Sequence, residues 1–230
     1  MLWTFTTAAG SYLYIVFMIV PAVIVSLFSK NGDLVHLMAR SWARFSLKCA
    51  RTQVELRGRE NLPGGPAVYM ANHASFFDVF AILGYLDVQF RWVVKKELFT
   101  IPLLGLAMRR IGYIMIDRAN HESAMRSMQQ AAEKIRGGIS IFIFPEGTRS
   151  LDGTIRYPFK KGGFHLAMQA NVPIVPITVK GSREVLPKHG KRVRPGKITL
   201  IAGRPIHPSG HNVETLMEEV YNSIKLGYSL

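Results

Sequence analysis

An uncharged stretch from Leu2 to Ser29 constrains the fold of this chain most, and its second half, from Leu13 to Phe28, is almost entirely apolar. A segment of this length enters a bilayer and is borderline for crossing one, because a span needs about 20 apolar residues. Pro21 is expected to kink a helix here. A signal peptide fits poorly, since no Lys or Arg precedes the apolar run and no small-x-small cleavage site follows it. The alternative is a buried core helix, which normally carries a polar stripe.

A second helix is predicted from Asp33 to Ala50, with Asp33 able to cap its start. Arg40, Arg44 and Lys48 recur every four residues and therefore share one face. The neighbouring face carries Leu34, Met38, Trp42, Phe45 and Cys49. This pattern is typical of a basic amphipathic helix at a lipid headgroup layer. A surface helix of a soluble domain with a solvated charged stripe is the alternative.

The charges that follow the apolar run predict its orientation. Between Lys30 and Arg59 there are seven basic and two acidic side chains, and no charged side chain lies ahead of the run. The positive-inside rule then places the rest of the chain in the cytoplasm, at the inner face of the cell membrane. We therefore expect a membrane anchor over residues 1–50. A single span and a two-helix hairpin dipping into one leaflet both remain open.

From residue 51 to residue 230 the pattern alternates between short β-rich runs and helical segments. The predicted strands are Gln53–Arg57, Ala67–Met70, Gln89–Val94, Tyr113–Ile116, Ile139–Phe144, Pro173–Val179 and Lys197–Ala202. The predicted helices are Phe76–Tyr85, Glu97–Arg109, His121–Arg136, Gly163–Ala170 and Val213–Ile224. Such alternation predicts an α/β domain, with a largely parallel, mixed sheet flanked by helices.

The net charge of +14 has to be reconciled with 48% hydrophobic residues, a fraction that excludes a disordered chain. Half of that charge, a net +7, lies between Lys180 and Arg204, where only Glu184 opposes eight basic residues. A solvated loop is the default for such a stretch, but beside a membrane anchor it favours attraction to anionic lipids. Cys49 is the single cysteine, which excludes a disulfide framework and a Cys-based zinc site.

Two segments carry residues suited to catalysis and to binding of an anion. His73 sits where a predicted strand ends, and Asp78 follows five residues later in the first helical turns, so a turn brings its carboxylate toward the imidazole. Such a pair forms a general base, although a His near an Asp is more often a capping arrangement. The run Phe144–Ser150 also follows a strand, and its glycine, hydroxyls and Arg149 suit a phosphate. An exposed arginine on a tight turn is the alternative.

Two further segments mean little by themselves. Gly112–Arg118 is a predicted strand that ends in an acid and a base, and alone it reads as a surface ion pair. Val172–Ile177 is apolar and contains two prolines, so we expect an edge, a strand start or a bend.

Taken together, the four segments resemble the sequence blocks of the glycerolipid acyltransferases, especially the bacterial 1-acyl-sn-glycerol-3-phosphate acyltransferases. The block N-H-x-x-x-x-D is met from Asn72 to Asp78, and F-P-E-G-T-R-S is met in full at Phe144–Ser150. The block V-P-I-V-P-I is met in full at Val172–Ile177, while Gly112–Arg118 has Met115 where the family has Phe. The resemblance covers residues 54–202 in the family's order.

The resemblance implies transfer of a fatty acyl group from acyl-carrier protein or acyl-CoA to the sn-2 hydroxyl of 1-acyl-sn-glycerol 3-phosphate, giving phosphatidic acid. His73 and Asp78 would form the general base for direct attack on the thioester, because Ser75 lacks a nucleophile elbow. The phosphate would be held by Arg149, Gly147, Thr148 and Arg118. Glu146 would orient Arg149 or the glycerol hydroxyls. The acyl-pocket wall would be Val172, Pro173, Ile174, Val175, Pro176 and Ile177.

No metal or organic cofactor is expected, since the seven histidines show no ligand spacing and His165 reads as structural. The expected partners are a bilayer with anionic lipids, a lysophospholipid acceptor and the thioester donor. One alternative is the same chemistry on glycerol 3-phosphate, a lyso-ornithine lipid or another lysophospholipid. A second is a non-catalytic membrane-surface binder of acidic lipids. A nucleic-acid binder is disfavoured because the chain has no recognised binding motif.

Overall fold

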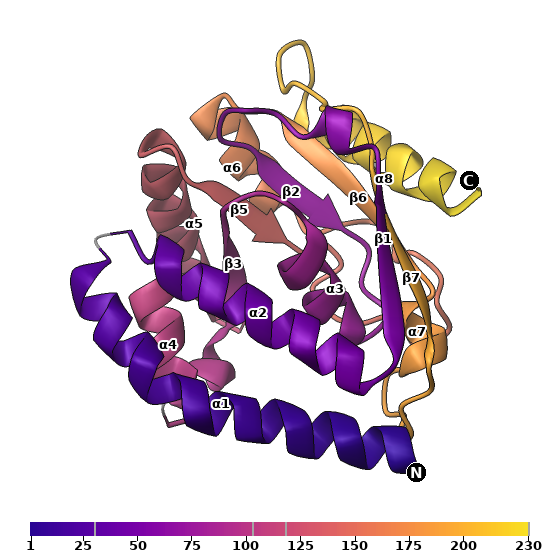
Figure 1. Cartoon of the computed structure of the whole chain (residues 1–230). Coiled ribbons are helices and arrows are strands. Elements are labelled where there is room, and N and C mark those ends of the chain that lie inside the picture. Colours follow the sequence, from indigo (N-terminus) through magenta and orange to yellow (C-terminus); the bar gives the residue numbers. More distant parts are fainter. Residues whose placement is uncertain (30, 103, 118, 230) are drawn as a thin grey trace.

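The computed structural model describes residues 1–29, 31–102, 104–117 and 119–229 (Figure 1). The strands are β1 (Thr52–Arg57), β2 (Val68–Ala71), β3 (Phe90–Lys95), β4 (Ile114–Ile116), β5 (Ser140–Ile143), β6 (Ile174–Lys180) and β7 (Gly196–Ala202). The α-helices are α1 (Leu2–Phe28), α2 (Asp33–Cys49), α3 (Phe77–Tyr85), α4 (Leu104–Ile111), α5 (His121–Arg136), α6 (Gly162–Ala170), α7 (Ser182–Val185) and α8 (Val213–Ser229). Two 3-10 helices are η1 (Arg59–Asn61) and η2 (Lys96–Thr100).

All seven strands form one sheet in the order β1-β7-β6-β2-β5-β3-β4. Every neighbouring pair is parallel except β6 and β7, so β2 to β6 run in one direction and β1 and β7 run in the other. The predicted largely parallel mixed sheet with flanking helices is therefore confirmed. The carboxyl ends of five strands meet at one edge, which is where open α/β sheets place their sites.

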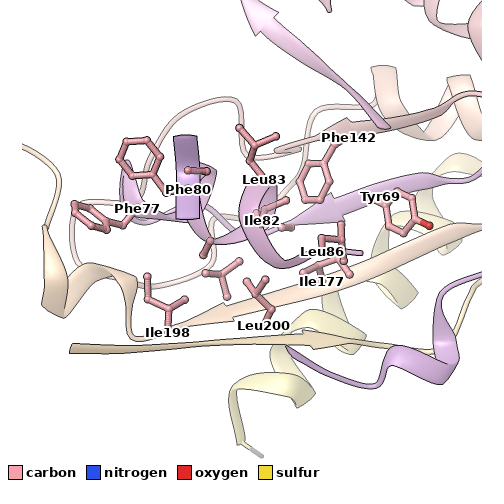
Figure 2. Packing of buried hydrophobic residues seen from close by; sticks show 14 of the residues in the cluster. Tyr69, Phe77, Phe80, Ile82, Leu83, Leu86, Phe142, Ile177, Ile198 and Leu200 are labelled. Carbon is pink, nitrogen blue, oxygen red and sulfur yellow. The ribbon is translucent and has the colours of Figure 1, made fainter. Parts of the chain in front are cut away.

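Consecutive residues of the central strands supply two separate cores, because neighbouring side chains on a strand point to opposite faces. Tyr69 and Phe142 belong to the cluster covered by α2, α3 and α7, while Val68 and Ile141 belong to the cluster covered by α5, α6 and α8. Figure 2 shows the first cluster, where side chains of α3 gather with those of β2, β5, β6 and β7. The sheet is thus buried on both faces.

The second helix contributes to this core. α2 lies between α1 and α3 (Figure 1), and its Ala43 and Leu47 are fully buried. Arg40 is buried as well and donates to Asp87 Oδ1 at 2.9 Å, so the prediction that its row faces a lipid headgroup layer is wrong for this residue. The reason is a partner 47 residues away that periodicity cannot reveal. The division of the chain at residue 50 stays a prediction.

In the described part of the chain, α1 is the one helix long and apolar enough to cross a membrane, with a mean hydropathy of 2.3 over its most apolar window. It continues through Pro21 and bends along its length (Figure 1). It packs on α2 through small polar groups, including a 2.7 Å hydrogen bond from Ser11 Oγ to Ser46 Oγ. Its other side leaves large side chains such as Phe5, Phe17 and Phe28 more than 70% exposed. An exposed apolar surface of this kind is typical of a membrane or protein contact.

Two prolines bear on the predicted elements. The predicted helix Glu97–Arg109 is divided into η2 and α4, because Pro102 forces the preceding Ile101 into an extended conformation. Of the edge, strand start or bend expected for Val172–Ile177, the strand start is observed, since β6 begins at Ile174; it is a central strand that contains Pro176. The Pro176 carbonyl accepts from Gly203 N, just beyond the end of β7. The N and O of one strand residue point to the same side of the strand, so the nitrogen of Pro176 also points toward β7. The N–H that proline lacks would therefore not have bonded to β2.

Candidate active site

The candidate site lies at the edge of the sheet where the neighbouring strands β2 and β5 end. His73 follows β2 and Phe144 follows β5, and their rings stack with centroids 3.9 Å apart and planes 11° from parallel. Asp117 follows β4 farther along the same edge and pairs with Lys96 at 2.5 Å. Arg118, which we expected at the phosphate, lies outside the described residues. The edge therefore brings two of the four sequence blocks into direct contact.

The expected contact between the histidine and the aspartate is present. His73 Nδ1 lies 2.8 Å from Asp78 Oδ2, and the same oxygen accepts from the backbone N–H groups of Ala74 and Ser75, each at 2.8 Å. Asp78 is fully buried, whereas the His73 side chain is 16% exposed. Because a carboxylate can only accept, this bond places the proton on Nδ1 and leaves Nε2 to take a proton from a substrate.

Asn72 fixes the end of β2 next to the histidine, a role that the sequence did not show. Its side chain accepts from Val179 N at 2.8 Å and donates to Val179 O at 3.0 Å, so it bridges to β6. It also lies 3.3 Å from the Tyr228 hydroxyl of α8. The only sequence signal was that Asn72 precedes His73 in its motif. These bonds hold the histidine backbone between two strands and the last helix.

Ser75 has a structural role. Its hydroxyl donates to Leu186 O at 2.6 Å and accepts from Phe77 N at 3.0 Å, and the residue is fully buried. The second bond is a local side-chain-to-backbone bond just before α3. A hydroxyl that is buried and engaged in this way is unsuited to attack a thioester, which agrees with the absence of a nucleophile elbow.

Glu146 binds backbone groups of two loops. Its Oε1 accepts from His73 N at 2.7 Å and its Oε2 accepts from Arg156 N at 3.2 Å. Burial raises the pKa of this carboxyl to about 7, against the opposing effect of these two bonds. No contact with the Arg149 guanidinium is found among the described residues, so that part of the expectation is not met. The suggested role toward glycerol hydroxyls stays a prediction.

The remaining residues of this segment form a turn beside the histidine, in which only Thr148 is exposed. Ser150 N donates to His73 O at 2.7 Å, and Gly147 has a φ of 72°, a conformation that favours glycine. Arg149 is half-buried. Lys188 donates from Nζ to Arg149 O at 2.8 Å, a contact that the sequence analysis missed. Its only signal was membership of the basic stretch between residues 180 and 204.

The predicted pocket wall, residues 172–177, is built into the sheet. Five of its six members are buried, Val175 and Ile177 in the core on the α3 side and Ile174 in the core on the α6 side. Their role toward an acyl chain stays a prediction. Among the residues that the structure describes, no group of three or more His, Cys, Asp or Glu side chains is placed to hold a metal ion.

The fold and the site define an α/β protein with a histidine–carboxylate pair at the carboxyl edge of a largely parallel sheet. A family model described as Acyltransferase matches residues 53–180. The chain therefore belongs to the Acyltransferase family, which confirms the resemblance drawn from the four blocks.

Named relatives agree with this assignment. The chain is 35% identical over 192 residues to the chloroplastic 1-acyl-sn-glycerol-3-phosphate acyltransferase BAT2 of Brassica napus, covering 82% of this chain and 54% of the relative. It is 31% identical over 188 residues to the 1-acyl-sn-glycerol-3-phosphate acyltransferase of Pseudomonas aeruginosa, covering 80% of this chain and 72% of that relative. Three plant and algal relatives are spanned over only 52 to 62% of their length.

A solved structure extends the likeness to the N-terminal helices. The crystal structure of the 1-acyl-sn-glycerophosphate (LPA) acyltransferase PlsC from Thermotoga maritima superimposes with a TM-score of 0.86 at 27% identity. The match covers 99% of this chain and 94% of that one. The similarity therefore includes α1 and α2 as well as the α/β domain.

Proposed function

We propose that this protein is a 1-acyl-sn-glycerol-3-phosphate acyltransferase, which acylates the sn-2 hydroxyl of its acceptor and releases phosphatidic acid. The observation that carries the proposal is the His73–Asp78 pair at 2.8 Å beside the Thr148–Arg149 turn, in a member of the Acyltransferase family. The names of the relatives supply the acceptor. The proposal is further supported by the hydrogen bond from Ser150 N to His73 O, which places the backbone of the Arg149 turn next to that of the histidine.

The chemistry follows from the orientation of the imidazole. His73 Nε2 takes the proton of the sn-2 hydroxyl as the hydroxyl oxygen attacks the thioester carbonyl carbon. Asp78 keeps the ring in place through Nδ1 and stabilises the imidazolium that forms. When the tetrahedral intermediate collapses, the carbon–sulfur bond breaks and the imidazolium returns the proton to the leaving thiolate. No acyl-enzyme forms, which agrees with the engaged hydroxyl of Ser75.

The Thr148–Arg149 turn serves the phosphate in this proposal. Arg149 offers a planar fork for phosphate oxygens, and Gly147 and Thr148 complete the turn next to His73. Glu146 acts as a strut, since its two oxygens join the backbone of the catalytic turn to that of Arg156. Arg118, which lies outside the described residues, is expected to contribute to the same phosphate site. No organic cofactor enters this scheme, and the acyl donor is acyl-carrier protein or acyl-CoA.

The substrate is a lipid, and α1 supports a membrane location for the protein. We propose that the exposed apolar side of α1 enters the cytoplasmic leaflet of the cell membrane while the opposite side stays packed on α2. This arrangement corresponds to the one-leaflet hairpin, because α1 and α2 are joined by hydrogen bonds such as that between Tyr14 Oη and Ser41 Oγ at 2.6 Å. Exposed basic residues after α7 would face anionic headgroups.

A purified acyl-transfer assay with a panel of acceptors tests the proposal. The panel contains 1-acyl-sn-glycerol 3-phosphate, glycerol 3-phosphate, a lyso-ornithine lipid and an uncharged lysophospholipid, each with acyl-CoA and with acyl-carrier protein. We expect the highest kcat/KM for 1-acyl-sn-glycerol 3-phosphate. A higher kcat/KM for another acceptor would mean that the enzyme catalyses the same acyl transfer with that acceptor as its substrate.

The variant His73→Ala separates an enzyme from a non-catalytic binder of acidic lipids. We expect this variant to fold and to lose turnover, because proton transfer contributes typically 10²–10⁴-fold to such reactions. His165→Ala is the matched control, since His165 is exposed on α6. Near wild-type turnover in His73→Ala would refute the proposed mechanism.

A further inference from the structure

Lys188 lies in the segment between α7 and β7, outside all four sequence blocks. This segment is bonded directly to the catalytic turn, because Ser75 Oγ donates to Leu186 O at 2.6 Å. Two residues farther on, the half-buried side chain of Lys188 reaches the turn that follows β5. A fifth segment of the chain thus lies against the candidate active site.

The ammonium group of Lys188 has two acceptors on the Thr148–Arg149 turn. Nζ lies 2.8 Å from Arg149 O and 3.4 Å from Thr148 Oγ1. Both acceptors are uncharged, so these bonds place the ammonium without neutralising it. An ammonium has three N–H donors, and these two bonds leave one for another acceptor.

The charge at this turn is uncompensated within the described part of the chain. Neither Lys188 nor Arg149 takes part in any ion pair there, although other cations such as Arg40 and Lys161 do. An anion bound at this turn would be attracted by both cations, since neither has a carboxylate partner in the described part of the chain. Arg149 offers a fork and Lys188 a point charge, which are complementary ways to bind phosphate oxygens.

We propose that Lys188 binds the phosphate of the acceptor together with Arg149, and that the segment after α7 is a part of the acceptor site. The inference rests on the proposed function, since it assumes a phosphorylated acceptor at His73. The competing role for Lys188 is purely structural: its hydrogen bonds would only hold the conformation of the Thr148–Arg149 turn. If the role is structural, loss of Lys188 lowers kcat/KM equally for every acceptor. If Lys188 binds the phosphate, its loss lowers kcat/KM only for acceptors that carry a phosphate.

The test compares Lys188→Ala with Lys191→Ala, which removes the same charge from an exposed position three residues farther along the same segment. The kcat/KM is measured for 1-acylglycerol 3-phosphate and for 1-acylglycerol, which has the same hydroxyl but no phosphate. Lys188→Ala should lower the first value at least tenfold, equivalent to about 1.4 kcal/mol, and leave the second within twofold. Lys191→Ala should leave the ratio of the two kcat/KM values unchanged. Lys188→Arg should recover most of the kcat/KM for 1-acylglycerol 3-phosphate that Lys188→Ala loses.

A second measurement does not depend on turnover of the unphosphorylated acceptor. Inorganic phosphate is titrated as a competitive inhibitor against the acceptor, and its inhibition constant should rise at least tenfold in Lys188→Ala and stay constant in Lys191→Ala. Equal losses for both acceptors, or an unchanged inhibition constant, would overturn the inference. Absence of wild-type transfer to 1-acylglycerol 3-phosphate would instead overturn the proposed function, so the two failures are distinguishable.

Discussion

Substitution of Asp78 by Asn separates the two roles of this carboxylate, orientation and charge. Asp78 Oδ2 accepts three hydrogen bonds, from His73 Nδ1 and from the N–H groups of Ala74 and Ser75. An amide oxygen can accept all three, while the amide nitrogen takes the place of Oδ1, which has no partner among the described residues. We therefore expect Asp78→Asn to keep the fold, the ring orientation and the position of the Nδ1 proton.

What the amide lacks is the negative charge that stabilises the imidazolium. Two unit charges about 4 Å apart interact by about 4 kcal/mol at an effective dielectric constant of about 20. Because the imidazolium carries only part of its charge in the transition state, we expect kcat to fall by about 10²–10³-fold. Steady-state kinetics with both substrates should show KM values within twofold of the wild type.

The variant Asp78→Ala is the companion measurement. It leaves the buried N–H groups of Ala74 and Ser75 without their acceptor, at a cost of about 1–3 kcal/mol for each. Urea denaturation should therefore show a larger loss of stability for Asp78→Ala than for Asp78→Asn, which keeps an acceptor for both backbone N–H groups but buries an amide NH2 where Oδ1 has no partner. The reasoning is refuted if Asp78→Asn keeps more than a tenth of wild-type kcat, or if the two variants are equally unstable.

Three further predictions concern the Glu146 carboxyl group, the phosphate site and membrane binding. Burial raises the pKa of Glu146 to about 7 from 4.5, so this residue's contribution to stability is fully present below about pH 4.5 and is lost as the pH rises through 7. In urea titrations from pH 4.5 to 8, the wild type should lose about 3 kcal/mol relative to Glu146→Gln, and parallel pH profiles would contradict the raised pKa. Arg149→Ala should raise the KM of the phosphorylated acceptor at least tenfold with little effect on the KM of the thioester, and equal effects on both would argue against a phosphate role. In cell fractionation, the protein should sediment with membranes and be released only by detergent, whereas recovery in the soluble fraction would refute anchoring through residues 11–50.

The strands were predictable because each is a short apolar run bounded by turn residues. All seven observed strands begin and end within one residue of their predicted limits, for example Ser140–Ile143 against the predicted Ile139–Phe144. α5 matches its predicted range, since its apolar residues follow a helical period up to a glycine pair. Local pattern was sufficient wherever the neighbours along the chain decide the conformation.

The environment of a side chain was harder to predict, because it depends on contacts between distant segments. The helical period placed Arg40 on the same face as Arg44, but only the packing of α2 on α3 reveals Asp87 as its partner. The two prolines of Val172–Ile177 left an edge, a strand start and a bend open, and only the strand order shows that a central strand starts here. For Arg40 the sequence pattern was right and the inferred surroundings were wrong, whereas for the prolines the sequence left alternatives that the fold decides.

The site shows the same distinction between residues within one motif and residues brought together by the fold. His73 and Asp78 could be paired from sequence since they are five residues apart, at the end of a strand and the start of a helix. The bond from His73 N to Glu146 could not, because it exists only if β2 and β5 are neighbours in the sheet. Lys188 is still less accessible to sequence reasoning, since its partner on the Thr148–Arg149 turn is about forty residues away and no motif contains it. The sequence motifs therefore identify the candidate reactive groups, and the strand order determines which loops position them.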